Sequence, residues 1–453
     1  MSNIVFDADS ESVSDSLDLF TVPSHQLAVE NFFPTEVLAT HPLSNASSQI
    51  VFDVPLSDEF SDLDQSLLVV KVRIKNADGT NLGPFVGNTQ ANPAAANSVA
   101  FVNNSLNSLF SGVDIKLNGV SVNSNFFTNA YVTYIQTLLS YGYDAFESKL
   151  QLSGWELEDD LEANEAHNGA EASSGYYKRG QKTKESRVWT LAGPLHSSIT
   201  LQNRYILPLV PISITLTKSR PEFCLHSNAQ NPNFLIEITS AKVIIKRVKI
   251  LSTYKLRIEN ELLKNEALYP LKTFECRPYS LDAGVKSFTF SNLFPTNSTI
   301  PDHCVVGFLR QTDFAGDIRH SCYRFDHFSL EEVSISFDQH RFSYECQYDD
   351  EANLDYVSSY QGLFLGNGSK SNTGLTITFE QFAKGFALYS FYFNREEALN
   401  GDLWNAKIAG SARLSCKFSA GSNNPALICL VYSSENQLLK INSRREIIRT
   451  YNI

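Results

Sequence analysis

The sequence predicts an all-β protein made of two similar antiparallel sandwich domains in tandem. Three observations support this fold class: a composition rich in strand-forming residues, a period-two alternation of apolar and polar side chains, and an internal repeat. Aromatic residues make up 12% of the chain, with 31 Phe and 19 Tyr against a single Met, and such residues suit a pleated, half-buried surface. At 453 residues, the chain has room for two large β domains.

Period-two alternation marks many segments as half-buried strands. In residues 66–75, SLLVVKVRIK, the apolar Val70, Val72 and Ile74 alternate with basic side chains. Other segments with strand character are VDIKL, RYILPLV, PISITLT, FLIEI, AKVIIKRVKI, KSFTF, CVVGFLR, EVSISF, LTITF, FALYSFYF, ARLSCKF and ALICLVY. Many short strands separated by turn residues indicate antiparallel sandwiches.

Three segments break this pattern and predict helices. Within residues 127–150, Tyr131 and Ile135 lie at helical spacing along with neighbouring leucines. A shorter helix is predicted over residues 354–366. A third, near residues 256–270, would connect the two halves of the chain.

The predicted strands and helices recur in the same order in the two halves. At a constant offset of 220 residues, the strand residues Val113, Ile115 and Leu117 are followed by Val333, Ile335 and Phe337. The helix that begins at Tyr131-Val132 is matched, at an offset of 225, by Tyr356-Val357. A strand, a turn, a helix and further strands in each half favour two copies of one β domain.

The charge distribution narrows the possible partners. Residues 1–70 contain 12 acidic residues and no Lys or Arg, whereas the other 383 residues carry 37 bases and 37 acids. A chain with a net charge of −12 and no basic stripe is not expected to bind nucleic acid sequence-specifically. The first residues lack a signal-peptide pattern, and no apolar run is long enough to span a membrane. We therefore expect an intracellular chain with reduced thiols.

No pattern of catalytic or metal-binding residues stands out. The densest group of possible metal ligands comprises His303, His320, His327 and His340, with Asp302, Asp326 and Asp338. Their spacing fits no metal motif. The seven cysteines lack C-x-x-C spacing and are expected to be small buried residues. The sequence thus predicts no catalytic site, no metal site and no cofactor, although distant carboxylates of a hydrolase would escape this search.

A long polar segment, residues 156–190, interrupts the first predicted domain. Its first part is acidic and its second part, which begins at Tyr176 and Tyr177, is basic. We predict a long loop whose opposite charge blocks fold onto each other or onto the complementary block of a neighbouring subunit, and whose tyrosines anchor a contact with another subunit. The alternative is a solvated surface loop. The basic C-terminus, with Arg444, Arg445 and Arg449, has two interpretations: a contact with nucleic acid or an acidic partner, or a solvated last strand or tail.

Several blocks together resemble a known family, the double jelly-roll major capsid proteins of Polinton/Maverick elements and the related adintoviruses. The similar blocks are DLFTVPSHQLAVENFFP, SLNSLFSGVDIKLNGVSVNSNFFTNAYVTYIQTLLSYG, LAGPLHSSITLQNRYILPLVPISITLTKS, AKVIIKRVKI with ALYPLK, FSNLFPTNSTIPDHCVVGFLRQTDFAG and GFALYSFYFN. Together they are spread over most of the chain. The arm before Asp18 and the 156–190 segment match no family pattern.

The resemblance implies two tandem eight-stranded antiparallel jelly rolls with a few short helices in the loops. It divides the chain into a flexible acidic arm, an N-terminal roll that includes the 156–190 loop, a connector and a C-terminal roll. The boundaries expected for these four parts are 1–24, 25–255, 256–275 and 276–453. In this family three copies form a pseudo-hexagonal trimer that tiles an icosahedral shell, so the resemblance implies a capsid role in the virion rather than an enzyme. Penton and minor capsid proteins would be its partners, and assembly would take place inside the host cell, in the nucleus.

Aromatic residues near the end of the arm are further candidates for contacts between subunits. Phe20, Phe32 and Phe33 could dock on a neighbouring copy, or could instead belong to the core beneath the first strand. The function also has an alternative: an intracellular, lectin-like tandem sandwich that binds a soluble ligand. That protein would be a monomer or dimer, whereas a capsid protein would form trimers and larger assemblies.

Overall fold

The structure is a computed structural model, and it describes most of the chain. The described residues are 26–85, 99–122, 127–158, 175–227, 229, 232–294, 299–348, 354–364, 375–393 and 407–450. The predicted acidic arm, residues 1–24, and with it Phe20, lies outside them.

The first half of the chain forms a sandwich of two four-stranded antiparallel sheets. The strand orders are β1-β10-β3-β7 in one sheet and β2-β8-β5-β6 in the other. These eight strands are β1 (Val29–Leu38), β2 (Gln49–Val54), β3 (Phe60–Asn76), β5 (Phe110–Leu117), β6 (Val120–Ser121), β7 (Trp189–Pro194), β8 (Ile212–Lys218) and β10 (Phe234–Ile250). Strands distant in the sequence pair within each sheet, which is the topology of a jelly roll.

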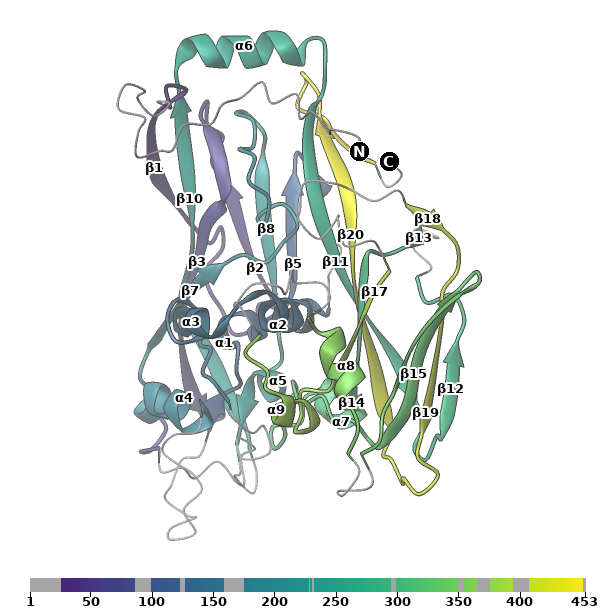
Figure 1. The fold of residues 1–453 in the computed structure, drawn as a ribbon. Helices are drawn as coiled ribbons and strands as arrows, with labels where there is room; N and C mark the ends of the chain where they lie inside the picture. The colour runs from purple at the N-terminus through teal and green to yellow at the C-terminus, as the bar shows by residue number, and fades with distance from the viewer. Residues whose placement is uncertain are drawn as a thin grey trace, which may run out of the picture.

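The second half repeats this arrangement beside the first (Figure 1). Its sheets have the orders β11-β20-β14-β17 and β12-β19-β15-β16. These strands are β11 (Ala267–Leu281), β12 (Ser287–Phe290), β14 (His303–Arg310), β15 (Leu330–Phe337), β16 (His340–Glu345), β17 (Leu388–Tyr392), β19 (Arg413–Phe418) and β20 (Leu427–Ile441). We call the two sandwiches roll 1 and roll 2. The prediction of two tandem eight-stranded antiparallel jelly rolls is confirmed.

The repeat found in the sequence corresponds to equivalent places in the two rolls. Strands β5 and β15, which carry the matched apolar residues, are each the third strand of their sheet. The matched helices are α2 (Asn129–Ser140), between β6 and β7, and α8 (Val357–Gly362), between β16 and β17. Both helices therefore belong to the same connection of the jelly roll.

The helices gather at two places. Figure 1 shows α6 (Ser252–Leu262) lying across one end of the molecule, where it joins β10 to β11. The others lie toward the other end: α1 (Ser105–Ser108), α3 (Tyr143–Phe146), α4 (Gly175–Thr183), α5 (Pro221–Cys224), α7 (Gln311–Ala315) and α9 (Phe379–Ala383), with 3-10 turns at Lys149–Ser153 and Lys184–Ser186. Short strand pairs complete the fold: β4 (Ala100–Phe101) with β9 (Leu225–His226), β13 (Thr299–Ile300) with β18 (Ile408–Ala409), and β21 (Ile447–Thr450) with β20.

Some predicted elements differ from the observed ones. RYILPLV (204–210) and LTITF (375–379) form no strands, and the latter leads into α9. The connector, expected at residues 256–275, consists of α6 and the four residues after it, and β11 begins at Ala267. The helices predicted over residues 127–150 and 354–366 are present as α2, α3 and α8.

Period-two alternation places the core as predicted. Val70, Val72 and Ile74 of β3 are completely buried inside roll 1, while Lys71 between them is exposed. Burying each such aliphatic side chain stabilises the fold by about 1.5–3 kcal/mol.

Candidate assembly surfaces

Helix α2 belongs to roll 1 by sequence but packs into the core of roll 2. Ten of its twelve residues are buried, and its apolar side chains join the core cluster formed by the strands of roll 2. The ring of Tyr134 stacks on that of Tyr323 of roll 2, with the centroids 4.1 Å apart. Tyr131 stacks on Phe314, also of roll 2, at 5.4 Å. The helix thus supplies an aromatic contact between the two rolls.

Roll 1 also covers the outer edge of strand β11. Among the described residues, this strand is the edge of its sheet and pairs only with β20. Its carbonyls accept hydrogen bonds from roll 1: Thr128 Oγ1 donates to Cys276 O at 2.9 Å, and Arg204 Nη1 donates to Leu268 O at 2.6 Å. An exposed edge strand offers unpaired polar groups to other chains, so this contact satisfies an otherwise open edge.

The basic C-terminal segment includes a last strand, β21, as one interpretation predicted, and its arginines connect the rolls. Arg445 pairs with Glu259 of α6 at 2.6 Å, and its Nε donates to Pro208 O of roll 1 at 3.0 Å. Arg449 Nη1 donates to Ser121 O, also of roll 1, at 3.0 Å. These arginines act within the chain, whereas Arg444 beside them is exposed.

The predicted contact residues of the 156–190 segment turn inward. Residues 175–183 form helix α4, and Tyr176 is completely buried, with its ring 5.7 Å from that of Phe85. Tyr177 is partly buried against the same ring at 5.6 Å. The loop expected here is therefore partly a docked helix, and Tyr176 anchors its own chain rather than a second subunit.

A buried ion pair fixes α4 in this position. Arg179 Nη2 lies 2.8 Å from Glu158 Oε1, and the two side chains are only 1% and 3% exposed. The Nε of Arg179 donates to Phe101 O of strand β4 at 2.8 Å. Arg179–Glu158 and Lys182–Glu156 join the basic and acidic blocks within one chain, which is one of the arrangements predicted for them. The sequence did not identify the individual partners, because tertiary packing brings them together.

Phe32 and Phe33 lie on β1, the edge strand of roll 1. Phe32 is 64% exposed and Phe33 is 40% exposed, so neither is a core residue. Lys246 of β10 sits over the ring of Phe32, 5.1 Å from its centroid. Both side chains are available to another molecule.

The histidines grouped in the sequence do not converge in the structure. His303 is buried and stacks on Tyr392 at 4.0 Å, and His327 stacks on Tyr348 at the same distance. His340 is an exposed residue of β16. His320 meets two carboxylates, and these come from residues outside the predicted set.

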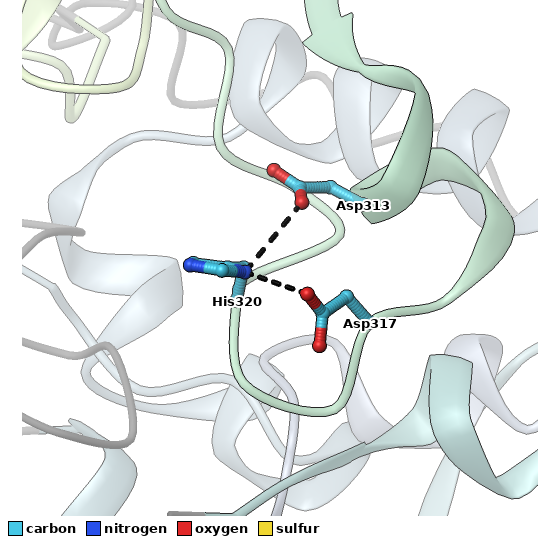
Figure 2. Close-up of side chains that lie close together, drawn as sticks. All are labelled: Asp313, Asp317 and His320. Carbon is cyan, nitrogen blue, oxygen red and sulfur yellow. Dashed lines mark hydrogen bonds and ion pairs between the residues drawn. The ribbon is translucent and has the colours of Figure 1, made fainter. Parts of the chain in front are cut away.

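Figure 2 shows the cluster of Asp313, Asp317 and His320, just after β14. His320 Nδ1 lies 2.8 Å from Asp317 Oδ2 and 3.8 Å from Asp313 Oδ1. Burial raises the pKa of Asp313. Burial alone would also raise the pKa of Asp317, but hydrogen bonds from the Arg319 amide and the His320 ring lower it overall. An imidazole between two carboxylates could give way to a divalent cation, yet the hydrogen bond between His320 and Asp317 accounts for this cluster without one.

The seven cysteines are all buried and unpaired, as predicted. Burial raises the pKa of the thiol in each of them, for example Cys304 and Cys416. Raised pKa values keep these thiols protonated and unreactive, so none has the character of a nucleophile.

The end of the molecule that carries α6 exposes apolar side chains. Leu256 and Leu263 project from and beyond this helix and are 63% and 76% exposed. Lys255 of the same helix pairs with Asp58 of roll 1 at 2.5 Å.

No helix in the described ranges is both long and apolar enough to cross a bilayer.

Comparisons with known proteins agree with the topology. No protein-family model matches the chain. An uncharacterized protein of Caenorhabditis elegans is 20% identical over 362 residues, which cover 78% of this chain and 83% of that protein. A chain in the cryo-EM structure of the Sputnik virophage superposes with a TM-score of 0.64 at 12% identity, over 100% of this chain and 95% of that one.

Two further solved structures are similar over nearly their whole length. The mavirus major capsid protein has a TM-score of 0.53 at 12% identity, with 99% of this chain and 96% of that chain covered. The Faustovirus major capsid protein has a TM-score of 0.51 at 9% identity, with 93% and 92% covered. These chains and the strand order of both rolls lead to one conclusion: the protein has the double jelly-roll fold found in viral major capsid proteins.

Proposed function

We propose that this protein is a major capsid protein. Its pseudo-hexagonal homotrimers would tile the icosahedral shell of a double-stranded DNA virus or virus-like element. The observation that carries the proposal is the pair of rolls with identical strand order standing side by side, together with the full-length likeness to capsid chains. A capsid role is structural and involves no catalytic step.

Two equivalent rolls in one chain suit a hexagonal lattice. Three copies supply six similar sandwiches around one axis. The outline of the trimer is then nearly hexagonal and can have six neighbours, although its rotational symmetry is threefold and closes at three copies. The described part of the chain also places α6 across one end of the molecule and its other helices between the middle and the opposite end. Such a molecule has two distinct ends, as a shell with an inside and an outside requires.

The finer assignments follow from this role. Residues 1–24 would form an acidic arm, residues 25–255 and 276–453 the two rolls, and the stretch between them the connector. Penton and minor capsid proteins would complete the shell, with assembly in the nucleus of the host cell. A lectin-like tandem sandwich remains the alternative, but no feature of the described residues favours it.

The mass of the protein in solution tests the proposal. We expect light scattering after size exclusion to give the mass of three 50.6 kDa chains, and electron microscopy of that peak to show hexagonal outlines or closed shells. A stable monomer at every concentration would contradict the trimer and would direct attention to ligand screening for the binding-module alternative.

A further inference from the structure

The cluster of Asp313, Asp317 and His320 lies at the boundary between the two rolls. Its residues belong to roll 2, on helix α7 and the turns that follow it (Figure 2), and we call them the roll 2 cluster. The same segment is hydrogen-bonded to roll 1, because the amide of Ser227, just after β9, donates to Ile318 O at 2.8 Å. The cluster is therefore held beside strand β9.

A second contact holds this segment against roll 1. Gly316, between the cluster residues, has a φ of +97°, and a β-carbon there would lie 3.1 Å from the backbone nitrogen of Phe223 in α5. The side chain of Arg220, which precedes α5, donates to Ala315 O. Backbone thus lies against backbone, and the spacing between the cluster and roll 1 is fixed.

Strand β9 contributes a buried histidine, His226, whose polar atoms lack partners. The residue is 2% exposed, and neither ring nitrogen makes a hydrogen bond of normal geometry to a described residue. Leaving a buried polar atom unpaired costs free energy, and an ion or a water molecule commonly accounts for such a group. Because Ser227 follows it in the sequence, His226 stands next to the backbone contact with the cluster segment.

The electrostatic surroundings of His226 also place its ring beside the cluster. Burial lowers the pKa of this imidazole to about 3, and the charge of Arg179, which is itself paired with Glu158, lowers it further. The His320 backbone and the Asp317 carboxylate act in the opposite direction. A backbone group affects a ring in this way only at short range. The ring is neutral at physiological pH, and neutral imidazole is the form that binds metal ions.

Asp313 supplies a buried negative charge that the chain compensates only in part. Its side chain is 2% exposed, and burial raises its pKa despite the charges of His320 and Arg310 and the hydrogen bond from Thr312. His320 Nδ1 lies 3.8 Å away and is already hydrogen-bonded to Asp317. A buried carboxylate is costly unless a cation lies close to it, and a bound metal ion would supply that cation.

We infer that His226 and the roll 2 cluster together form a binding site for one Zn²⁺ ion. The ring nitrogens of the two histidines and one carboxylate oxygen from each aspartate would be its ligands. Four protein ligands without an open position are typical of a structural zinc site. Imidazole ligands favour Zn²⁺ over Ca²⁺ and Mg²⁺, which prefer oxygen. The hydrogen bond between His320 and Asp317 explains those two residues, but it leaves His226 unexplained.

The geometry requires only small movements. The three ligand atoms of the roll 2 cluster lie within 4.8 Å of one another, whereas the ligand atoms around a tetrahedral Zn²⁺ are roughly 3.4 Å apart. His226 breaks no hydrogen bond with a described residue when its ring turns toward them. Asp317 and His320 are 30% and 28% exposed, which gives the ion a path of entry. The ion would tie roll 1 to roll 2, and this role does not depend on the proposed capsid function.

Titration with Co²⁺ tests the site, because Co²⁺ occupies zinc sites and absorbs visible light strongly only when its coordination is tetrahedral. We expect the metal-free full-length chain to bind one Co²⁺ with a strong visible spectrum, and Zn²⁺ to displace it. Zn²⁺ should also raise the thermal midpoint, and EDTA should reverse the rise, because an ion that binds only the folded chain stabilises it.

The variant His226→Phe removes one ligand and keeps a buried ring. We expect it to weaken Zn²⁺ binding by about 10-fold or more and to lose the tetrahedral Co²⁺ spectrum. His303→Phe, the same change at another buried histidine, is the matched control and should bind both ions as the wild type does. His226→Gln replaces His226→Phe should the latter fail to fold.

Two outcomes would overturn the inference. One is a wild-type chain that retains neither Co²⁺ nor Zn²⁺ once free ions are removed, or that binds Co²⁺ with a weak octahedral spectrum. The other is a His226→Phe chain that binds Zn²⁺ with unchanged affinity, since the cluster would then bind metal without roll 1. Neither outcome bears on the proposed capsid function, which the mass of the protein in solution tests separately.

Discussion

Single residues show where local chemistry determines the fold and where a residue's role in the fold cannot be read from the sequence. Arg179 and Glu158 are nearly inaccessible to solvent, yet each belongs to a charged block that has the composition of a solvated loop. A buried ion pair of this kind depends on partners that tertiary packing brings together. The opposite charges of the two blocks predicted that they could fold onto each other, but spacing and periodicity do not identify which residues pair or show that the pair is buried.

Removing one member of this ion pair should lower the free energy of unfolding more than removing both members. We expect Arg179→Met to lower the free energy of unfolding by about 3–5 kcal/mol, because it leaves the Glu158 carboxylate buried without its cation. The double variant Arg179→Met with Glu158→Leu should recover much of this loss. Urea unfolding of the two single variants and the double variant measures the coupling free energy between the two side chains. If the changes in the two single variants simply add up in the double variant, the expectation is contradicted.

His303 should make the stability depend on pH. Burial, assisted by the charge of Lys272, lowers the pKa of this imidazole to about 3, and it stacks on Tyr392 beside the Ser390 hydroxyl. The unfolded chain takes up a proton near pH 6.5 but the folded chain does not. The contribution of His303 to the free energy of unfolding is therefore fully present above pH 6.5. Below that pH it falls by about 1.4 kcal/mol for each pH unit, until the pH reaches about 3.

The variant His303→Phe isolates this effect. It keeps the ring stack and removes the titrating group, so its thermal midpoint should fall less than that of the wild type between pH 7 and pH 5. Calorimetry at both pH values checks the difference. An equal fall in the two proteins would show that His303 does not carry this dependence.

At the scale of elements, the strands with a clear period of two were predictable, and so was helix α2, because apolar periodicity survives in both. Helix α4 was not, since its buried face consists of Gly175, Tyr176, Arg179, Gly180 and Thr183, which has almost no apolar signal. LTITF alternates like a strand but leads into α9, whose capping box joins Thr378 and Gln381. The T-x-x-Q spacing of that box was a signal present in the sequence.

The docking of α4 should be sensitive to one glycine. A methyl group on Gly180 would overlap the ring of Phe85, although Ala normally stabilises a helix interior by about 1 kcal/mol relative to Gly. We expect Gly180→Ala to undock α4 and to expose residues 175–186 to limited proteolysis. Gly421→Ala, where nothing lies near the added methyl, is the control, and equal digestion of the two variants would contradict the expectation.

At the scale of the whole molecule, the two rolls share their cores. Residues of α2 lie in the core cluster of roll 2. In return, Tyr269 and Leu271 of β11 and Leu439 and Ile441 of β20 join the core cluster of roll 1. The tandem domains could be predicted from the sequence repeat, but this exchange could not, because strict repetition implies two separate cores.

The shared cores predict cooperative unfolding. We expect a single calorimetric transition whose van't Hoff and calorimetric enthalpies agree, since neither roll retains a complete core without the other. Tyr323→Ala, which removes the stack on Tyr134, should lower that transition without splitting it. Two resolved transitions in the wild type would show that the rolls unfold independently.

The buried thiols have a consequence for the life of a particle. All seven sulfur atoms are shielded, and their protonated form neither attacks disulfides nor reacts readily with oxidants. A shell assembled from this chain would keep the same covalent structure when it passes from the reducing interior of a cell to the oxidising medium outside. Its mechanical integrity would then depend on noncovalent contacts, before and after release.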